Sequence, residues 1–297
     1  KLCVSCKGCR RECPTGVDMA KMKIEVLHAR NKRVGLSPRD RLIAYLPRYA
    51  PYAARVPRLM NGLMWLRDRV PGAAALSERL TGFAAVRALP RWAKQPFDHP
   101  VGWAEGAASA AEAQHRQDER WASPEGSAQP TGSAIKPEVA LLADTFNTYF
   151  EPDNLQAAVE VLERLGYRVL LPAPVEGTRP LCCGRTFLAA GLVDEAKAEA
   201  RRTLEALAPL IERGLAVVGL EPSCLLTLRD EFLVMGLGPE AERLSKQAFL
   251  LEEFLAREMV AGRIKEPIGA LDGKLRLHGH CHQKAFGIMP DIQKALG

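Results

Sequence analysis

The sequence lacks the long apolar runs, leader segments and recognition motifs that mark several broad classes of protein. No part of its 297 residues approaches the roughly 18 uninterrupted apolar residues that a membrane-spanning helix needs. It does not open with the charged and then apolar segment of a secretory signal, and it contains no recognised nucleic-acid-binding motif. Hydrophobic residues make up 47% and charged residues 26%, which fits a folded globular protein and excludes collagen-like, coiled-coil and disordered chains. The first residue is Lys1 rather than methionine, so we interpret the chain as a fragment or a processed form.

The two parts of the chain carry opposite charge. Residues 1–100 contain 20 lysines and arginines against 7 aspartates and glutamates, whereas the remaining 197 residues contain 21 against 28. A basic region can attract nucleic acid, anionic lipid or an acidic protein. Without a nucleic-acid-binding motif we expect no nucleic-acid partner. The plain alternative is that these charges lie on solvated helix faces. The short helices expected over residues 37–94 could lie on a membrane surface or pack on a neighbouring domain, and we favour the second.

Eight cysteines are the most informative residues, and four of them lie in the string CVSCKGCRRECP at residues 3–14. Cys3, Cys6, Cys9 and Cys13 follow the spacing C-x2-C-x2-C-x3-C-P, which is typical of 4Fe–4S clusters in bacterial ferredoxins. Zinc sites usually pair two cysteine motifs across a longer loop, so these short gaps favour iron–sulfur over zinc. Two roles are open for Cys13, because the fourth cysteine of two-cluster ferredoxins binds the other cluster.

The residues between these cysteines suit a cluster. Gly8 lets the backbone approach the inorganic sulfides, whose charge favours amide N–H donors. Lys7, Arg10 and Arg11 would offset the negative charge of a cluster bound by four thiolates. Free thiols at metal-ligand spacing, with no leader segment, predict a reducing, cytoplasmic compartment.

The rest of the chain predicts an α/β fold behind a helical segment. Asp18 can cap a helix that runs to about Lys32, and short proline-interrupted helices follow over residues 37–94. Strands at 139–143, 167–171 and 216–220 alternate with helices at 153–165 and 194–213. This alternation predicts a parallel sheet.

A partial repeat suggests a second α/β unit. Residues 275–286 align with 139–150 at a constant offset of 136, so that Cys281 corresponds to Thr145 and a strand is expected near 275. We therefore predict four parts: a helical 4Fe–4S domain at 1–100, a flexible linker at 101–137, a first α/β repeat at 138–262 and the start of a second at 263–297.

The other four cysteines predict a second site. Cys182 and Cys183 are adjacent, and Gly184 can bend the chain so that both face one target, next to a helix start that would lower their pKa. Cys224 and Cys281 follow strands, at the carboxyl edge where open α/β sheets bind their ligands. We expect these four residues to converge on a metal or redox centre, with small apolar core residues as the alternative.

Three alternating histidines surround the last cysteine. In an extended chain His278, His280 and His282 would share one face, where they could bind zinc. The other interpretation, which we favour, is that they donate hydrogen bonds to cluster sulfur or carry protons.

At these residues the sequence resembles the iron–sulfur part of bacterial FAD-linked oxidases. CVSCKGCRRECPTGVDMAKMK, RPLCCGRTFLAAGLVDEA, LEPSCLLTLRDEF and HGHCHQKAFG look like segments of the D-lactate and D-2-hydroxyglutarate dehydrogenase type. The α/β part resembles the cysteine-rich CCG domain, which is shared with iron–sulfur subunits of glycolate oxidase and anaerobic glycerol-3-phosphate dehydrogenase and with heterodisulfide reductase.

The resemblance implies an electron-transfer role. Electrons would pass from substrate to an FAD in an upstream or separate flavin domain, through the clusters, to a quinone or an electron carrier. It implies Cys3, Cys6, Cys9 and Cys13 as cluster ligands, and Cys182, Cys183, Cys224 and Cys281 as CCG-type ligands of a second cluster. The sequence departs from a complete CCG repeat at Thr145 and Thr227, where the pattern has cysteines.

Two other functions stay open. One is an enzyme that resembles heterodisulfide reductase, with chemistry at a CCG-bound cluster. The other is a redox-inert zinc or thiol scaffold that joins subunits. We find no dinucleotide fingerprint and no flavin-binding motif in the sequence, so we expect no substrate oxidation by this chain alone.

Overall fold

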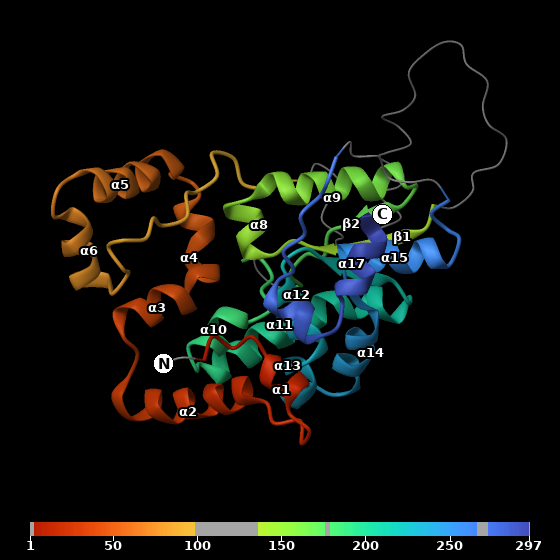
Figure 1. Ribbon diagram of the computed structural model, residues 1–297, viewed down its shortest axis with the longest axis horizontal. Helices are drawn as coiled ribbons and strands as arrows, with labels where there is room; N and C mark the ends of the chain where they lie inside the picture. The colour runs from red at the N-terminus through yellow and green to blue at the C-terminus, as the bar shows by residue number, and fades with distance from the viewer. Residues whose placement is uncertain (1–2, 99–135, 176–178, 266–272, 297) are drawn as a thin grey trace, which may run out of the picture.

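The structure is a computed structural model that describes residues 3–98, 136–175, 179–265 and 273–296. The predicted linker lies outside these ranges, apart from its last two residues. The described elements form a helical region at the N-terminal end and an α/β region built on one parallel sheet (Figure 1).

The sheet has four parallel strands in the order β2-β1-β3-β4. They are β1 (Glu138–Leu142), β2 (Arg168–Leu170), β3 (Ala216–Gly219) and β4 (Ala248–Leu250). The chain leaves β1 toward β2 on one side and then crosses to β3 on the other side of β1. The carboxyl ends of β1 and β3 therefore form a topological switch point, the place where open α/β sheets bind ligands.

Alternating residues of β1 divide the core into two layers. Val139 and Leu141 pack against α9 (Pro152–Arg164) and α15 (Leu251–Val260). Ala140 and Leu142 face the opposite layer, because successive strand residues point to opposite faces of a sheet. That layer contains α10 (Arg185–Ala189), α11 (Val193–Glu212), α12 (Pro222–Arg229) and α14 (Pro239–Gln247). Both faces of the sheet are buried, as a parallel sheet requires.

The helical region contacts the second of these layers. The Asp18 side chain caps α2 (Met19–Val34) by accepting hydrogen bonds from the amides of Ala20 and Lys21. This helix lies on the turn after α10, where Asn31 Nδ2 donates to the Ala190 carbonyl over 2.6 Å. The contact is close at Gly191, because a Cβ atom there would lie 2.5 Å from the Cβ of Leu27.

Four short helices follow α2. Helix α3 (Pro38–Ala44) packs on α10, and α4 (Leu46–Ala53) packs on α8 (Thr145–Tyr149). Helices α5 (Pro57–Arg69) and α6 (Ala73–Thr81) pack on each other and lie at the end of the molecule remote from the sheet (Figure 1). No helix in the described ranges is long and apolar enough to cross a membrane.

The predicted α/β class is confirmed, with three of the four strands at their expected places. Strand β4 was not predicted, since its three residues, AFL at 248–250, lie directly between α14 and α15 with no turn residues to mark its ends. The prediction of a strand near residue 275 is wrong, because residues 273–280 form no strand. Leu275 and Leu277 are exposed, since no described strand lies beside them. The repeat survives in another form, since α8 and α16 (Cys281–Ala285) both begin at the aligned residues.

Candidate functional site

The N-terminal cysteines lie on a tight surface segment, residues 3–13, which we call the cysteine loop; it contains the short helix α1 (Gly8–Glu12), with Cys9 inside the helix and Cys13 at its C-cap. Ser5 and Lys7 have positive φ angles of 59° and 62°, which non-glycine residues rarely adopt, and both side chains are buried. The cysteines around them are left on the outer side of the loop: Cys3 is exposed, and Cys6, Cys9 and Cys13 are half-buried. The loop is held from outside by Lys23, whose ammonium group donates to the Cys3 carbonyl over 2.7 Å.

The donor set of this loop fits an iron–sulfur cluster. Four thiols lie within eleven residues, and Gly8 lies next to the Cys6 sulfur, 3.6 Å from where its Cβ would stand. A hydrogen bond with the Thr15 hydroxyl, 3.1 Å away, and nearby backbone amides lower the pKa of Cys13 to about 7. Thiolates are the form that binds iron, so this residue is prepared as a ligand.

The second group of cysteines lies at the switch point of the sheet. Cys182, Cys183 and Cys224 are all buried, and the Cys183 sulfur interacts with both of the others. They line a small cavity together with Thr145, which begins α8 directly after β1. Thus three of the four cysteines predicted to converge do so, although up to 42 residues of sequence separate them.

The predicted fall in the pKa of these thiols is wrong. The Gly184 amide does face the Cys182 sulfur at 3.4 Å, where α10 begins. However, contact with Cys183 and burial raise the pKa of Cys182 well above its ordinary value. A hydrogen bond from the Cys183 thiol lowers the pKa of Cys224. Burial and the nearby carboxylates of Glu221 and Asp144 outweigh it and raise this pKa to about 12. The described site therefore holds neutral thiols.

The donors at the buried site fall short of a complete four-cysteine set. Thr145 supplies a hydroxyl where the CCG pattern has a thiol, and the Thr227 hydroxyl donates to the Ser223 carbonyl over 2.7 Å within α12. Three thiols do not provide the four that a cubane takes from protein. These residues alone do not fit a second cubane, and we derive no electron step through one.

Cys281 stands apart from the buried cysteines. It is exposed at the start of α16, which packs against α1 of the N-terminal loop, and it does not line the cavity that the other three share. The predicted role of Cys281 as a fourth ligand of that site stays untested.

The three-histidine zinc site is not formed. His282 is buried in α16, His280 caps the helix and stacks on His282 with ring centroids 5.2 Å apart, and His278 is exposed. A helix starts within the motif, so the extended spacing on which that hypothesis depended does not occur. Within the described ranges, no group of three or more His, Cys, Asp or Glu side chains is arranged to bind one metal ion.

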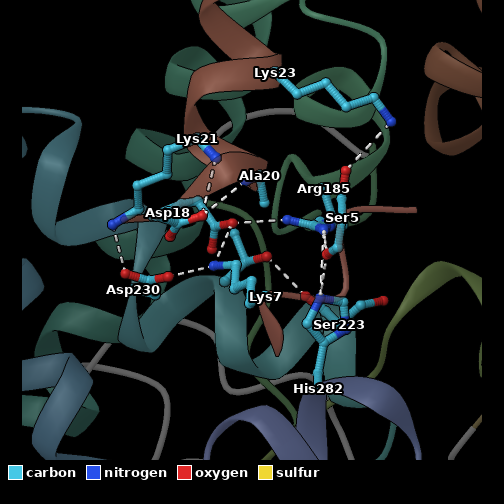
Figure 2. A network of polar contacts seen from close by, with 12 residues as sticks. Ser5, Lys7, Asp18, Ala20, Lys21, Lys23, Arg185, Ser223, Asp230 and His282 are labelled. Atoms are coloured by element: carbon cyan, nitrogen blue, oxygen red, sulfur yellow. Dashed lines mark hydrogen bonds and ion pairs between the residues drawn. The ribbon is translucent and has the colours of Figure 1, made fainter. Parts of the chain in front are cut away.

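A network of charged groups, buried at Lys7, Asp230 and Glu231, joins the N-terminal loop to the chain after Cys224 (Figure 2). Asp230 forms ion pairs with Lys7, Arg10 and Lys21, the last two over 2.9 Å and 2.6 Å. Glu231 pairs with Lys7 over 2.6 Å and with Arg185 over 2.7 Å. Burial alone would raise the pKa of Asp230, but hydrogen bonds from Lys21 and Lys7 outweigh it and lower the pKa to about 2. Asp230 is therefore charged at neutral pH.

Sequence reasoning missed this network. It used Lys7 and Arg10 only as charges near a cluster, and it gave no role to Asp230, Glu231, Arg185 or Ser5. The available signal was the pair Asp230–Glu231, which lies with Arg229 between two apolar runs after Cys224. Acidic residues are rarely buried without partners, so a buried carboxylate pair predicts cations from elsewhere in the chain.

Comparison with known proteins gives relatives that agree with the motifs. The chain is similar to part of the D-2-hydroxyglutarate dehydrogenases. It is 24% identical over 282 residues to that of Escherichia coli K12, an alignment covering 94% of this chain and 24% of the relative. It is 26% identical over 153 residues to one subunit of the anaerobic glycerol-3-phosphate dehydrogenase of E. coli K12, covering 51% and 37%. It is 28% identical over 165 residues to lactate utilization protein A of Bacillus subtilis 168, covering 54% and 64%.

These relatives confirm the resemblance that the motifs indicated. The chain spans about a quarter of the length of the D-2-hydroxyglutarate dehydrogenases that it matches. No family model matches it. No solved structure matches it either.

Proposed function

We propose that the chain is the iron–sulfur electron-transfer module of an FAD-dependent D-2-hydroxy-acid dehydrogenase. It would receive electrons from a flavin domain and pass them to an external acceptor, such as a quinone or an electron carrier. The observation that carries the proposal is the C-x2-C-x2-C-x3-C-P spacing of Cys3, Cys6, Cys9 and Cys13 on a surface loop. The relatives named as dehydrogenases and dehydrogenase subunits support it.

The loop residues have distinct tasks in this proposal. The four thiolates hold a 4Fe–4S cluster, which when bound accepts and releases one electron at a time. Gly8 lies next to the Cys6 sulfur, and Arg11 supplies positive charge beside the thiolates, together with Lys7 and Arg10, which also pair with Asp230 and Glu231. Because Cys3 is exposed, a redox partner can approach this side of the loop closely.

We assign FAD to a partner domain, either on the same polypeptide or in a separate subunit. The sequence contains no dinucleotide fingerprint, and hydride removal from a 2-hydroxy acid belongs to a flavin or nicotinamide cofactor. The chain by itself is therefore expected to show no substrate-dependent dye reduction with D-2-hydroxyglutarate or D-lactate. Dye reduction without added flavoprotein would contradict this assignment.

We also propose that the protein is cytoplasmic and contacts the inner face of the membrane. Leu59, Leu63 and Leu66 recur at helical spacing along α5, Val70 follows at its C-cap, and all four are 43–61% exposed. Arginines and a tryptophan flank the stripe, which suits insertion among anionic headgroups. The flanking side chains are Arg58, Trp65 and Arg69.

Anaerobic reconstitution with iron and sulfide tests the central proposal. The full chain should bind one oxygen-sensitive 4Fe–4S cluster, with about four irons per chain and a broad absorbance near ~400 nm. Anaerobically purified protein that contains stoichiometric zinc and no iron would contradict the proposal and support the zinc scaffold instead.

A further inference from the structure

The buried charge network joins parts of the chain that are far apart in sequence. Lys7 belongs to the cysteine loop, whereas Asp230 and Glu231 follow Cys224 at the end of α12, more than 220 residues later. Lys7, Asp230 and Glu231 are 3%, 4% and 2% exposed. Removing one partner of an ion pair this well shielded from water strongly lowers the stability of the protein, because the other charge stays buried and unpaired.

Arg185 connects the same network to the buried cysteines. Its guanidinium group donates to the Ser5 carbonyl over 3.3 Å and pairs with Glu231, while its backbone amide faces the Cys183 sulfur. One residue thus contacts the chain between Cys3 and Cys6 on one side and the buried thiols on the other. Figure 2 shows Arg185 between Ser5 and the network of Lys7 and Asp230.

His282 closes the network from α16. Its Nε2 atom lies 3.0 Å from the Ser5 carbonyl, so this nitrogen donates and Nδ1 carries the lone pair. Nδ1 is buried without a hydrogen-bond partner among the described residues, and so is Glu231 Oε2. Buried unpaired polar atoms lower stability, and proteins keep them mainly where a site requires them.

The charge balance of the network is positive. Four cations, Lys7, Arg10, Lys21 and Arg185, form ion pairs with two carboxylates, and the carboxylate of Asp18 lies in the same network, so cations outnumber carboxylates. An anionic group beside the loop would complete the balance. Bound thiolates with an iron–sulfur cluster are such a group.

We propose that this network, with Lys7 and Arg185 at its centre, is a positioning device that holds the cysteine loop at a fixed place against the three buried cysteines and sets the potential of the group bound in the loop. The proposal rests on the proposed function only for its second part. The positioning part concerns the chain itself and can be tested without metal.

The first test uses limited trypsin digestion of the metal-free full chain, followed at Arg10 and Arg11 in the loop. Asp230→Asn keeps the shape of the side chain but removes its charge, and it should raise the cleavage rate at least about tenfold, because the loop opens locally more often. The matched control is Glu258→Gln, which neutralises a buried carboxylate paired with Arg263 far from the loop. Equal cleavage rates at the loop in the two variants would overturn the positioning part.

The second test measures the reduction potential of the reconstituted cluster and its iron after a chelator challenge. Lys7→Met should lower the potential, because the reduced and more negative cluster loses a nearby cation, and Lys7→Arg should restore it. A potential that is the same in wild type and Lys7→Met would overturn the second part. If the wild-type chain binds no cluster, the proposed function fails, while the digestion test still decides the positioning part.

Discussion

The helical region and the α/β region each contain four cysteines but present them in opposite ways. In residues 3–98 the thiols lie on the outside of a surface loop, next to cations, and the pKa of Cys13 falls to about 7. In the α/β region, three of the four thiols are buried beside carboxylates, and the pKa of Cys224 rises to about 12. The same side chain is thus prepared to bind metal in one region and kept neutral in the other. Surroundings, more than the count of cysteines, decide what each group can do.

The two regions also differ in the binding partners that their surfaces suit. The helical region has an excess of positive charge and an exposed apolar stripe on α5, both of which face outward. The α/β region is acidic and uses its apolar residues in two internal layers. We therefore expect partners to meet the helical region, while the α/β region supports the loop from behind.

The largest expected difference between the regions is in cluster binding. Cys6→Ser should remove most of the iron and most of the absorbance near ~400 nm after anaerobic reconstitution, because a loop ligand is lost. Cys224→Ser should keep both, since its thiol lies at the other site. Iron analysis and absorption spectra of the two variants measure this. Equal losses in both variants would show that the sites are not independent.

The second largest difference is expected in the rate of thiol labelling of the metal-free native protein. At pH 8 iodoacetamide should modify the five accessible cysteines, Cys3, Cys6, Cys9, Cys13 and Cys281. A thiol with a pKa of about 12 is thiolate in only about one molecule in 10,000 at this pH, and burial slows access further. As the pH is lowered toward 7, about half of the Cys13 thiol should remain thiolate. Peptide mass spectrometry reads out each site, and rapid labelling of Cys182 or Cys183 would break the comparison.

A fourth thiol should allow the buried site to bind iron, as we expect the cysteine loop to do. Thr145→Cys places a thiol beside Cys182, Cys183 and Cys224 in a cavity that they already line. We expect additional iron after reconstitution in this variant, because the donor set becomes complete. Thr203→Cys is the matched control: Thr203 is also buried and donates to the Cys182 carbonyl, but it does not line the cavity. Iron content equal to that of the control would show that the site rejects metal for reasons other than its missing donor.

The smallest effect concerns the outer surface of the helical region. Changing Leu63 and Leu66 to Gln should weaken sedimentation with vesicles of phosphatidylcholine and phosphatidylglycerol by at least about tenfold, since full burial of one leucine contributes about 1.5–3 kcal/mol and tenfold corresponds to about 1.4 kcal/mol. Leu233→Gln, at an exposed leucine of the α/β region, should have no effect. Absence of wild-type binding to anionic vesicles would instead favour a protein partner for the stripe.

The local elements could be predicted because each has a local cause. Asp18 begins α2, Gly166 follows α9, and short runs of buried residues form β1 to β3. The convergence of Cys182, Cys183 and Cys224 also followed from sequence, since strands of a parallel sheet end at one edge.

The remainder depended on three-dimensional surroundings that a linear pattern does not contain. The rise in the pKa of Cys224 comes from burial, Glu221 and Asp144, which the fold brings together. The segment at 275–277 has the composition of a strand but no strand beside it in the described ranges. The partners of Lys7 lie more than 220 residues away, so only the structure reveals that the cysteine loop is fixed from within.

The close packing of Gly191 against α2 makes the distance between this helix and the α/β region depend on the size of residue 191. Any side chain there would act as a wedge, since even a Cβ atom would meet Leu27 at 2.5 Å and the backbone of His28 at 2.8 Å. Helix α2 follows the cysteine loop directly in the chain, so a displaced helix would carry the loop with it. We therefore expect a side chain at residue 191 to move the cysteine loop away from the α/β region without changing any charge or any sulfur atom.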